Sequence, residues 1–276
     1  MGRLAQTLGL RKRHHMTIPS EIQALIESSG NSFHARVAQW FSAEGWHLQV
    51  SPYYLDPTQQ KAREIDLIAE RHWAFKDGFA RHEGYVVVRL YIECKFVPSH
   101  AVFWFAEKSK READDLVHSI DGFTPNNIYA LKHHYLAQSE RVAKLFTSSQ
   151  SKLQEADLFY KALNQILSAY AAFRHQPSAS GSPSLNLHGK IVTMNFPVIV
   201  CSSFKNVYAA DFLGQLEPSI QQQNFQLEVR YAYGDASSTP RNEYFLIDIA
   251  SYDNLSLLTQ AIEVDVEAAS YLNSSH

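Results

Sequence analysis

The chain of 276 residues is 45% hydrophobic and 19% charged, which suits a globular protein with a large core and excludes wholesale disorder. No apolar run approaches the roughly 18 residues of a membrane span, and the basic N-terminus lacks the apolar segment of a signal peptide. The net charge of −3 gives no support for nucleic-acid binding. Cys94 and Cys201 provide neither a disulfide framework nor a zinc site, so we expect a cytoplasmic protein with reduced thiols and no membrane partner.

Residues 1–16 form a basic N-terminal arm whose first 15 residues contain no acid. Its basic side chains are Arg3, Arg11, Lys12 and Arg13, followed by His14 and His15. The arm could contact phosphates, or it could be a solvated tail. We assign residues 17–276 to one domain.

The first half of this domain is predicted to contain helices followed by strands. Apolar residues at helical spacing predict two helical pieces between residues 17 and 45. Alternating apolar and polar residues predict strands over residues 46–55 and 63–70. Residues 85–96 are rich in Val, Leu, Ile and Tyr, which is typical of a buried strand.

The second half is predicted to begin with helices and to end with more strands and a helix. Residues 101–105 are either a strand or the lead into a helix, and helical periodicity predicts helices over residues 126–146 and 151–173. Strands are predicted over residues 190–202, 206–210, 225–232 and 243–250, before a last helix over residues 255–272. This order predicts a mixed α/β or α+β domain.

Three charged residues point to a chemical function. Side chains alternate faces along a strand, so Glu93 and Lys95 should point to one side of the strand over residues 85–96 and Cys94 to the other. Burying such a pair is costly unless a site uses it. Asp66 lies on a neighbouring predicted strand, and two carboxylates on adjacent strand ends can hold Mg²⁺. With a nearby lysine to orient a water or neutralise charge, these groups are what phosphodiester hydrolysis needs.

The pattern Asp66…Glu93-Cys94-Lys95, preceded by an amphipathic helix, resembles the PD-(D/E)xK nuclease superfamily with its restriction-endonuclease-like fold. The order of helix, strand, Asp-bearing strand, Glu-x-Lys strand and helix is similar to the superfamily core over residues 20–150. The resemblance implies an α/β fold whose mixed central sheet is flanked by helices. It does not cover the C-terminal third, which we expect to be an α/β extension of the same domain. The resemblance also implies Mg²⁺-dependent, or Mn²⁺-dependent, cleavage of DNA, with Asp66 and Glu93 as metal ligands and Lys95 as the catalytic lysine.

Two positions depart from the superfamily pattern. Glu64-Ile65 precedes Asp66 where the superfamily has a proline, although that proline is commonly missing. His34 occupies the position on the first helix where many members carry a glutamate. Either His34 is a catalytic residue that holds a water or contacts the metal, or Glu27 supplies the carboxylate, or the third acid is missing.

We therefore expect a metal-dependent endonuclease of restriction, defence or repair type. If it cuts double strands with one site per chain, a homodimer is favoured. One alternative is an inactive nuclease-fold module that binds nucleic acid or a partner protein, with Asp66 as a surface acid and Glu93 and Lys95 as a plain salt bridge. Another is an unrelated α/β protein in which the motif arises by chance. We also expect Glu64 to pair with Lys95 or a nearby basic residue, and Cys94 to lie in the core.

Overall fold

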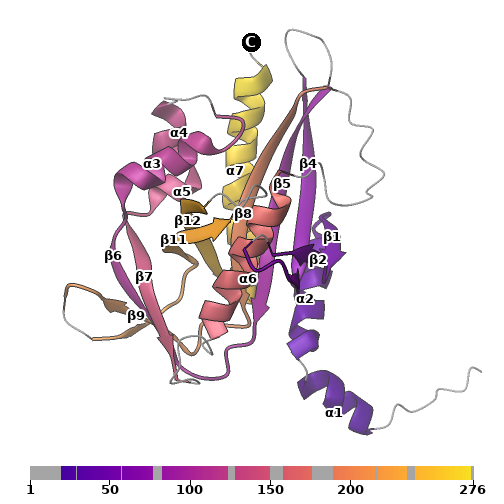
Figure 1. The fold of residues 1–276 in the computed structure, drawn as a ribbon, viewed down its shortest axis with the longest axis vertical. Helices are drawn as coiled ribbons and strands as arrows, with labels where there is room; N and C mark the ends of the chain where they lie inside the picture. Colours follow the sequence, from indigo (N-terminus) through magenta and orange to yellow (C-terminus); the bar gives the residue numbers. More distant parts are fainter. Residues whose placement is uncertain are drawn as a thin grey trace, which may run out of the picture.

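The structure is a computed structural model in which a large twisted sheet is covered by helices (Figure 1). It describes residues 20–28, 30–56, 58–76, 83–123, 128–149, 158–175, 189–214, 217–234 and 240–274. The basic arm expected over residues 1–16 lies outside this part of the chain. None of the described helices is long and apolar enough to cross a membrane.

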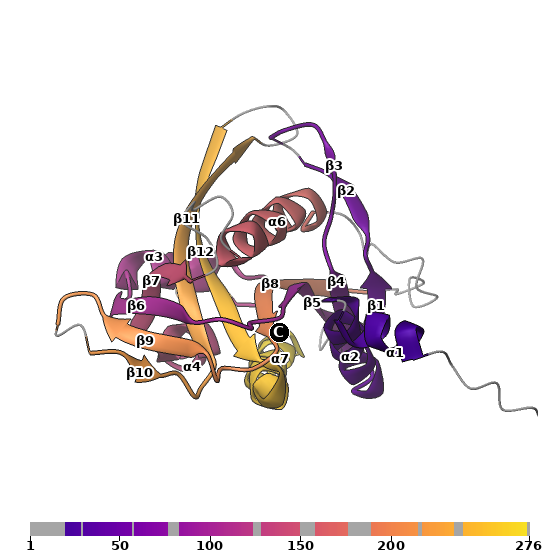
Figure 2. The same ribbon diagram turned by 90° about the horizontal axis from the view of Figure 1, so that it is seen from below.

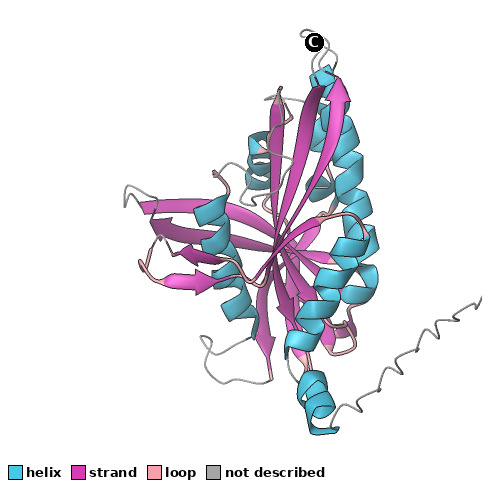
Figure 3. Ribbon diagram, turned by 90° about the vertical axis from the view of Figure 1, so that its right-hand side faces the viewer, coloured by secondary structure: helices cyan, strands magenta, loops and turns pink. Residues whose placement is uncertain are grey.

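Within the described residues, ten strands form one mixed sheet in the order β1-β4-β5-β8-β12-β11-β7-β6-β9-β10. These strands are β1 (His47–Val50), β4 (Leu67–Lys76), β5 (Glu83–Lys95), β6 (Ala101–Glu107), β7 (Arg141–Ser148), β8 (Ile191–Cys201), β9 (Val207–Asp211), β10 (Ser219–Ile220), β11 (Phe225–Gly234) and β12 (Pro240–Ser251). The strands fan out, so the two ends of the sheet run in different directions (Figure 3). The short strands β2 (Tyr53–Leu55) and β3 (Ala62–Glu64) pair separately, as a two-stranded ribbon.

The middle of the sheet is formed by β5 and β8, which are buried on both faces and therefore need apolar residues on both. β4 pairs with β5 in antiparallel fashion, whereas β8 pairs with β5 in parallel from Tyr85 to Lys95. β12 continues the parallel arrangement beside β8. The carboxyl ends of β5, β8 and β12 therefore meet at one edge of the sheet.

Helices cover both faces of this central part (Figure 2). The helices are α1 (Ser20–Ser28), α2 (Gly30–Ala43), α3 (Lys110–Ser119), α4 (Ile128–His133), α5 (Tyr135–Gln138), α6 (Leu158–Phe173) and α7 (Leu255–Ser274), with a 3₁₀ turn, η3, over Tyr252–Asn254. On one face, α2 and α7 pack on the even-numbered residues of β5, such as Leu90 and Ile92. On the other face, α6 packs on Tyr91. The even and odd residues of β5 thus face two separate cores.

Most predicted elements are confirmed, including the two helical pieces at the start, the strand over residues 85–96, which is part of β5, and the last helix. The helix predicted over residues 126–146 is wrong in its second half. Residues 128–138 form α4 and α5, but Arg141–Ser148 forms β7, which pairs with β6 and β11. Its side chains alternate between the two cores, with Val142 in one and Ala143 in the other, so pairing outweighs local helix propensity here.

The C-terminal strands lie inside the same sheet as the strand that carries Glu93. We expected a core over residues 20–150 and an extension after it. Instead, β8 pairs with β5 along most of its length, and α7 contributes Leu258 and Ile262 to the core against β5. The sheet therefore does not divide into a core and an extension at residue 150.

Candidate active site

Glu93 and Lys95 lie together at the carboxyl end of β5, on the face that α6 covers. Their neighbour Cys94 points to the opposite face and packs against the core beneath α2 and α7, as predicted. The Glu93 side chain is fully buried, and its Oε2 accepts a hydrogen bond of 2.5 Å from Nζ of Lys95. The strand thus delivers one buried carboxylate and one ammonium group to the same point.

Asp66 reaches the same point from a bend in the chain. The single strand predicted over residues 63–70 is wrong, because β3 ends at Glu64 and β4 begins at Leu67. The opposite segment bends at the same place, where Ser51 has a positive φ of 52° and its N–H donates to the Asp66 carbonyl at 2.9 Å. Asp66 therefore lies between two strand pairs and its side chain is free to turn toward β5.

The bend brings the Asp66 carboxylate to the end of β5. Oδ2 of Asp66 accepts a hydrogen bond of 2.7 Å from the Cys94 N–H and lies 4.0 Å from Nζ of Lys95. The Asp66 N–H in turn donates to Oε1 of Glu93 at 3.4 Å. Asp66 is the accessible member, with 26% of its side chain exposed, against 13% for Lys95 and none for Glu93.

The charges in this cluster are coupled. Burial raises the pKa of Glu93 to about 7, although Lys95 acts in the opposite direction. Burial lowers the pKa of Lys95, but Glu93 and Asp66 outweigh burial, so the pKa of Lys95 is raised overall. The lysine therefore stays protonated, while the Glu93 carboxylate is only partly compensated for the loss of water. Added positive charge at this point would stabilise it.

His34 contacts the bend through the backbone of Asp66. It lies on α2, and its Nε2–H donates to the Asp66 carbonyl at 2.7 Å. The ring thus helps to hold the bend, whereas the sequence suggested a group that holds water or metal. The side chain of Glu27, the alternative acid, lies outside the described part of the chain.

Glu64 has a different environment from the one predicted. Its carboxylate accepts hydrogen bonds from the side chains of Ser51 and Tyr53, and these lower its pKa, with a smaller contribution from His34. We expected an ion pair with Lys95 or with a nearby basic residue. Among the described ion pairs, Lys95 pairs with Glu93 and Asp66 and not with Glu64, and His34 is the basic residue whose charge acts on Glu64. Glu64 instead stabilises the bend, next to the site.

A second buried ion pair lies on the same face of the sheet and was missed in the sequence. The Arg89 guanidinium donates to Oε2 of Glu70 at 2.9 Å and to the Phe173 carbonyl of α6 at 3.4 Å, while Nε2 of His72 lies 2.8 Å from Oε1 of Glu70. An arginine inside a run of Val and Leu was the available signal, because a buried charge requires a partner. This pair fastens β4 and β5 to α6 behind the site.

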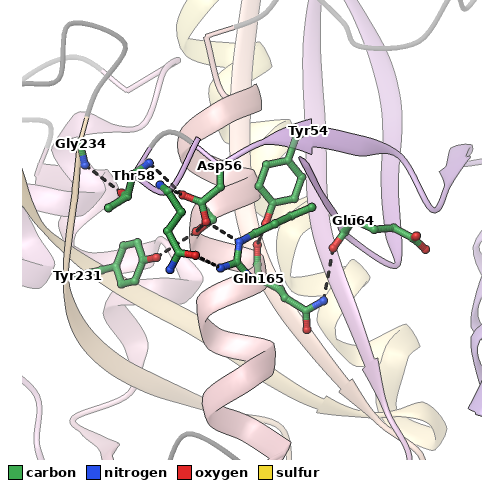
Figure 4. A network of polar contacts seen from close by, with 10 residues as sticks. Tyr54, Asp56, Thr58, Glu64, Gln165, Tyr231 and Gly234 are labelled. Carbon is green, nitrogen blue, oxygen red and sulfur yellow. Dashed lines mark hydrogen bonds and ion pairs between the residues drawn. The ribbon is translucent and has the colours of Figure 1, made fainter. Parts of the chain in front are cut away.

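The β2–β3 ribbon fixes the bend from the other side by packing against α6 (Figure 4). The Tyr54 hydroxyl donates to the Gln165 carbonyl at 3.0 Å, and the Gln165 amide donates to the Glu64 carbonyl at 3.4 Å. Beyond the ribbon, Asp56 forms an ion pair of 2.6 Å with Arg63. Asp66 is therefore held by contacts on both sides of the bend.

The donor set of the cluster suits a hard cation. Among the described residues, no group of three or more His, Cys, Asp or Glu side chains is arranged to hold a metal ion. Asp66 and Glu93 are thus the two side chains that could do so at this point. Mg²⁺ is commonly bound by one or two carboxylates while waters and phosphate oxygens complete its shell. Two carboxylates, one of them fully buried and partly uncompensated, fit that requirement.

Comparisons of the chain with protein-family models, with curated proteins and with solved structures gave no match.

Proposed function

We propose that the protein is a metal-dependent nuclease of the PD-(D/E)xK type, which hydrolyses phosphodiester bonds in DNA. The observation that carries the proposal is the meeting of Asp66, Glu93 and Lys95 within hydrogen-bonding or ion-pair distance at the end of β5. These residues are separated by up to 29 positions in the chain, so a chance Glu-x-Lys tripeptide would not bring an aspartate to the same point.

The order of elements supports the same proposal. The chain runs from α2 to β1, then to β4 behind the Asp66 bend, and then to β5 with Glu93 and Lys95 at its end. α6 follows and leads into β8, which lies parallel to β5. Up to β5 this is the order expected for a restriction-endonuclease-like core. The helix expected directly after the Glu-x-Lys strand is replaced by β6, and α6 follows only after β6, α3 to α5 and β7.

Each residue of the cluster has a role that its position allows. Asp66 and Glu93 would hold Mg²⁺ or Mn²⁺, which when bound supplies positive charge to a phosphate and lowers the pKa of a water. Lys95, kept protonated by its two carboxylate neighbours, would orient the attacking water or neutralise charge on the phosphate. His34 would act as a positioning residue, since it holds the carbonyl of Asp66 and not the reacting atoms.

A cleavage assay tests the proposal directly. Plasmid DNA and single-stranded DNA are incubated with the full chain and Mg²⁺ or Mn²⁺, and wild type is compared with Lys95→Ala. The matched control is Lys144→Ala, because Lys144 also forms a partly buried ion pair in the sheet, at 2.6 Å from Glu228 on β11. We expect cleavage by wild type and Lys144→Ala and a loss of at least 100-fold in Lys95→Ala.

The opposite results are equally informative. Cleavage that survives in Lys95→Ala would come from a contaminant or from another site, and it would contradict the proposal. Binding of DNA without cleavage by wild type, in either metal, would favour the inactive nucleic-acid-binding module. A homodimer, expected if the substrate is double-stranded, is tested by sedimentation of the protein with and without DNA.

A further inference from the structure

The sheet splits open between β8 and β12. These strands pair only over Val198–Cys201 and Asp248–Ser251, next to their carboxyl ends. Before that point they diverge, and α6 lies in the angle between them (Figure 2). Extending the observed register would place residues 193–197 opposite residues 243–247, yet no pairing of the described strands joins these segments.

The sequence explains where the split begins. Pro197 directly precedes the segment of β8 that pairs with β12, and proline has no N–H to donate to a neighbouring strand. The other edge of each strand remains paired through the same region, since β8 pairs with β5 and β12 pairs with β11. Only the two inner edges are left with N–H and C=O groups that face a gap, and such groups are costly to bury without partners.

A cavity of about 310 Å³ occupies the gap. It is lined by both inner strand edges, at Thr193 and Asn195–Pro197 of β8 and at Glu243–Leu246 of β12. The end of α3 closes one face of the sheet and the end of α6 closes the other, through Ile120 and Tyr170 among others. Its volume lies at the lower end of the range typical of small-molecule sites, about 300 to 1,000 Å³.

The lining selects for an uncharged, polar ligand. Arg174 is already paired with Glu243 at 2.7 Å, and Asp121 stands at the exposed rim, so there is no excess of positive charge for an anion. The strand edges and the Asn195 amide are poor partners for a purely apolar molecule. Nε of Arg174 is buried and donates to none of the described residues, which leaves one more donor at the wall.

The shape of the gap favours a flat ligand. A planar heterocycle in the plane of the sheet could exchange hydrogen bonds with both strand edges, as an inserted strand would. Two of the aromatic rings that line the same cavity, Tyr170 and Tyr244, are partly accessible, whereas Phe196 and Phe245 are buried. Such rings pack well against the face or edge of a base. A long peptide strand fits poorly, because helix ends cover both faces of the sheet here.

We propose that the cavity between β8 and β12 is a second binding site, which takes a nucleobase or a nucleoside. The site is separate from the carboxylate cluster. Glu93 lies opposite Ile199 in the β5–β8 register. Asn195 lies four residues before Ile199 on β8, a distance of about 13 Å along an extended strand. The proposal stands whether or not the chain cleaves nucleic acid.

Binding of the four ribonucleosides to the full chain tests the proposal. Adenosine, guanosine, cytidine and uridine are titrated separately by ligand-observed NMR, with backbone amide exchange measured at saturation. We expect at least one nucleoside to bind and to slow exchange at least tenfold at those amides of residues 193–196 and 243–246 that face the gap, because the alternate N–H groups point toward β5 or β11. No binding by any of the four at millimolar concentration would overturn the proposal, as would binding that leaves these amides unchanged.

A variant on β8 and one just before it provide the matched comparison. Thr193→Leu adds bulk inside the cavity, whereas Lys190→Leu changes an exposed residue just before the strand. We expect affinity to fall at least tenfold in Thr193→Leu and to stay unchanged in Lys190→Leu. Equal affinity in both would overturn the site. If Thr193→Leu does not fold, the exchange pattern of the wild type decides whether the nucleoside binds between β8 and β12. Protection of the same amides by an extended peptide alone would overturn the nucleoside assignment.

Discussion

At the scale of single residues, Glu93 and Lys95 stabilise each other only as a pair. The Glu93 side chain is fully buried and its principal compensation is the Lys95 ammonium at 2.5 Å. Removing one partner of a buried ion pair typically costs about 3 to 5 kcal/mol, whereas removing both can be neutral. The pair is therefore better explained by a function than by stability.

Lys95→Met should destabilise the fold by about 2 to 4 kcal/mol at pH 8, because it leaves the Glu93 carboxylate buried without compensation. The pKa of Glu93 is already raised to about 7, so at pH 5.5 its carboxyl is protonated and the loss should be smaller. The double variant with Glu93→Gln should recover most of the stability at pH 8. Urea unfolding at both pH values measures this, and a loss that is equal in the single and double variants would contradict it.

Asp248 should make the stability of the protein depend on pH. It is buried beside β11, accepts a hydrogen bond of 2.8 Å from the Tyr135 hydroxyl, and burial raises its pKa from the ordinary value of 3.8 to about 7. The folded state thus keeps a proton that the unfolded chain releases, so this contribution is present below pH 4 and is lost as the pH rises to 7.

Asp248→Asn should therefore reduce the fall in unfolding free energy between pH 4 and pH 7 by on the order of 2 to 4 kcal/mol. The amide can still accept from Tyr135, so packing should be preserved. Urea unfolding at several pH values in this range measures the slope. An unchanged slope would mean that Asp248 is ionised in the folded protein.

At the scale of elements, the turn after β2 fastens the ribbon that leads to Asp66. Oδ1 of Asp56 accepts from the N–H groups of Thr58 and Gln59, both at 2.9 Å, and the carboxylate pairs with Arg63 at 2.6 Å. Only 4% of the Asp56 side chain is exposed. Because these contacts are shielded from water, they should be worth more than the same contacts on the surface.

Asp211 offers a matched comparison for Asp56. It accepts from two backbone N–H groups, at 3.0 and 3.1 Å, and pairs with Arg141 at 2.8 Å, but 38% of its side chain is exposed. We expect Asp56→Ala to cost about 2 to 4 kcal/mol and Asp211→Ala to cost much less, because water screens its contacts. Thermal and urea unfolding of both variants test this. Equal losses would mean that burial does not strengthen the Asp56 turn.

The elements also mark how far the sequence could predict the structure. β5 was predictable from its long run of β-branched and aromatic residues, and alternation correctly placed Glu93 and Lys95 on one face and Cys94 on the other. The bend at Asp66 was not predictable, because it requires a matching bend at Ser51 and no local sequence pattern indicates that these two segments bend together. β7 was mistaken for a helix since its pairing partners lie far away in the chain.

At the scale of the whole molecule, the site depends on strands from both ends of the chain. β5 has one neighbour, β4, from the first half and the other, β8, from the second. Without β8, the edge of β5 that pairs with it from Tyr85 to Lys95 would be open to water. The superfamily resemblance over residues 20–150 therefore does not delimit a part that folds alone.

A fragment of residues 17–149 should not fold, although it contains Asp66, Glu93 and Lys95. We expect broad, poorly dispersed amide signals in NMR and no cooperative transition in urea, because apolar residues on both faces of β5 would be exposed. Co-expression with residues 158–276 should restore dispersed signals by supplying β8 and α7, whereas co-expression with residues 217–276, which lack β8, should not. Cooperative unfolding of the 17–149 fragment by itself would show instead that β5 does not need its C-terminal neighbour, and the cluster could then be studied on the fragment alone.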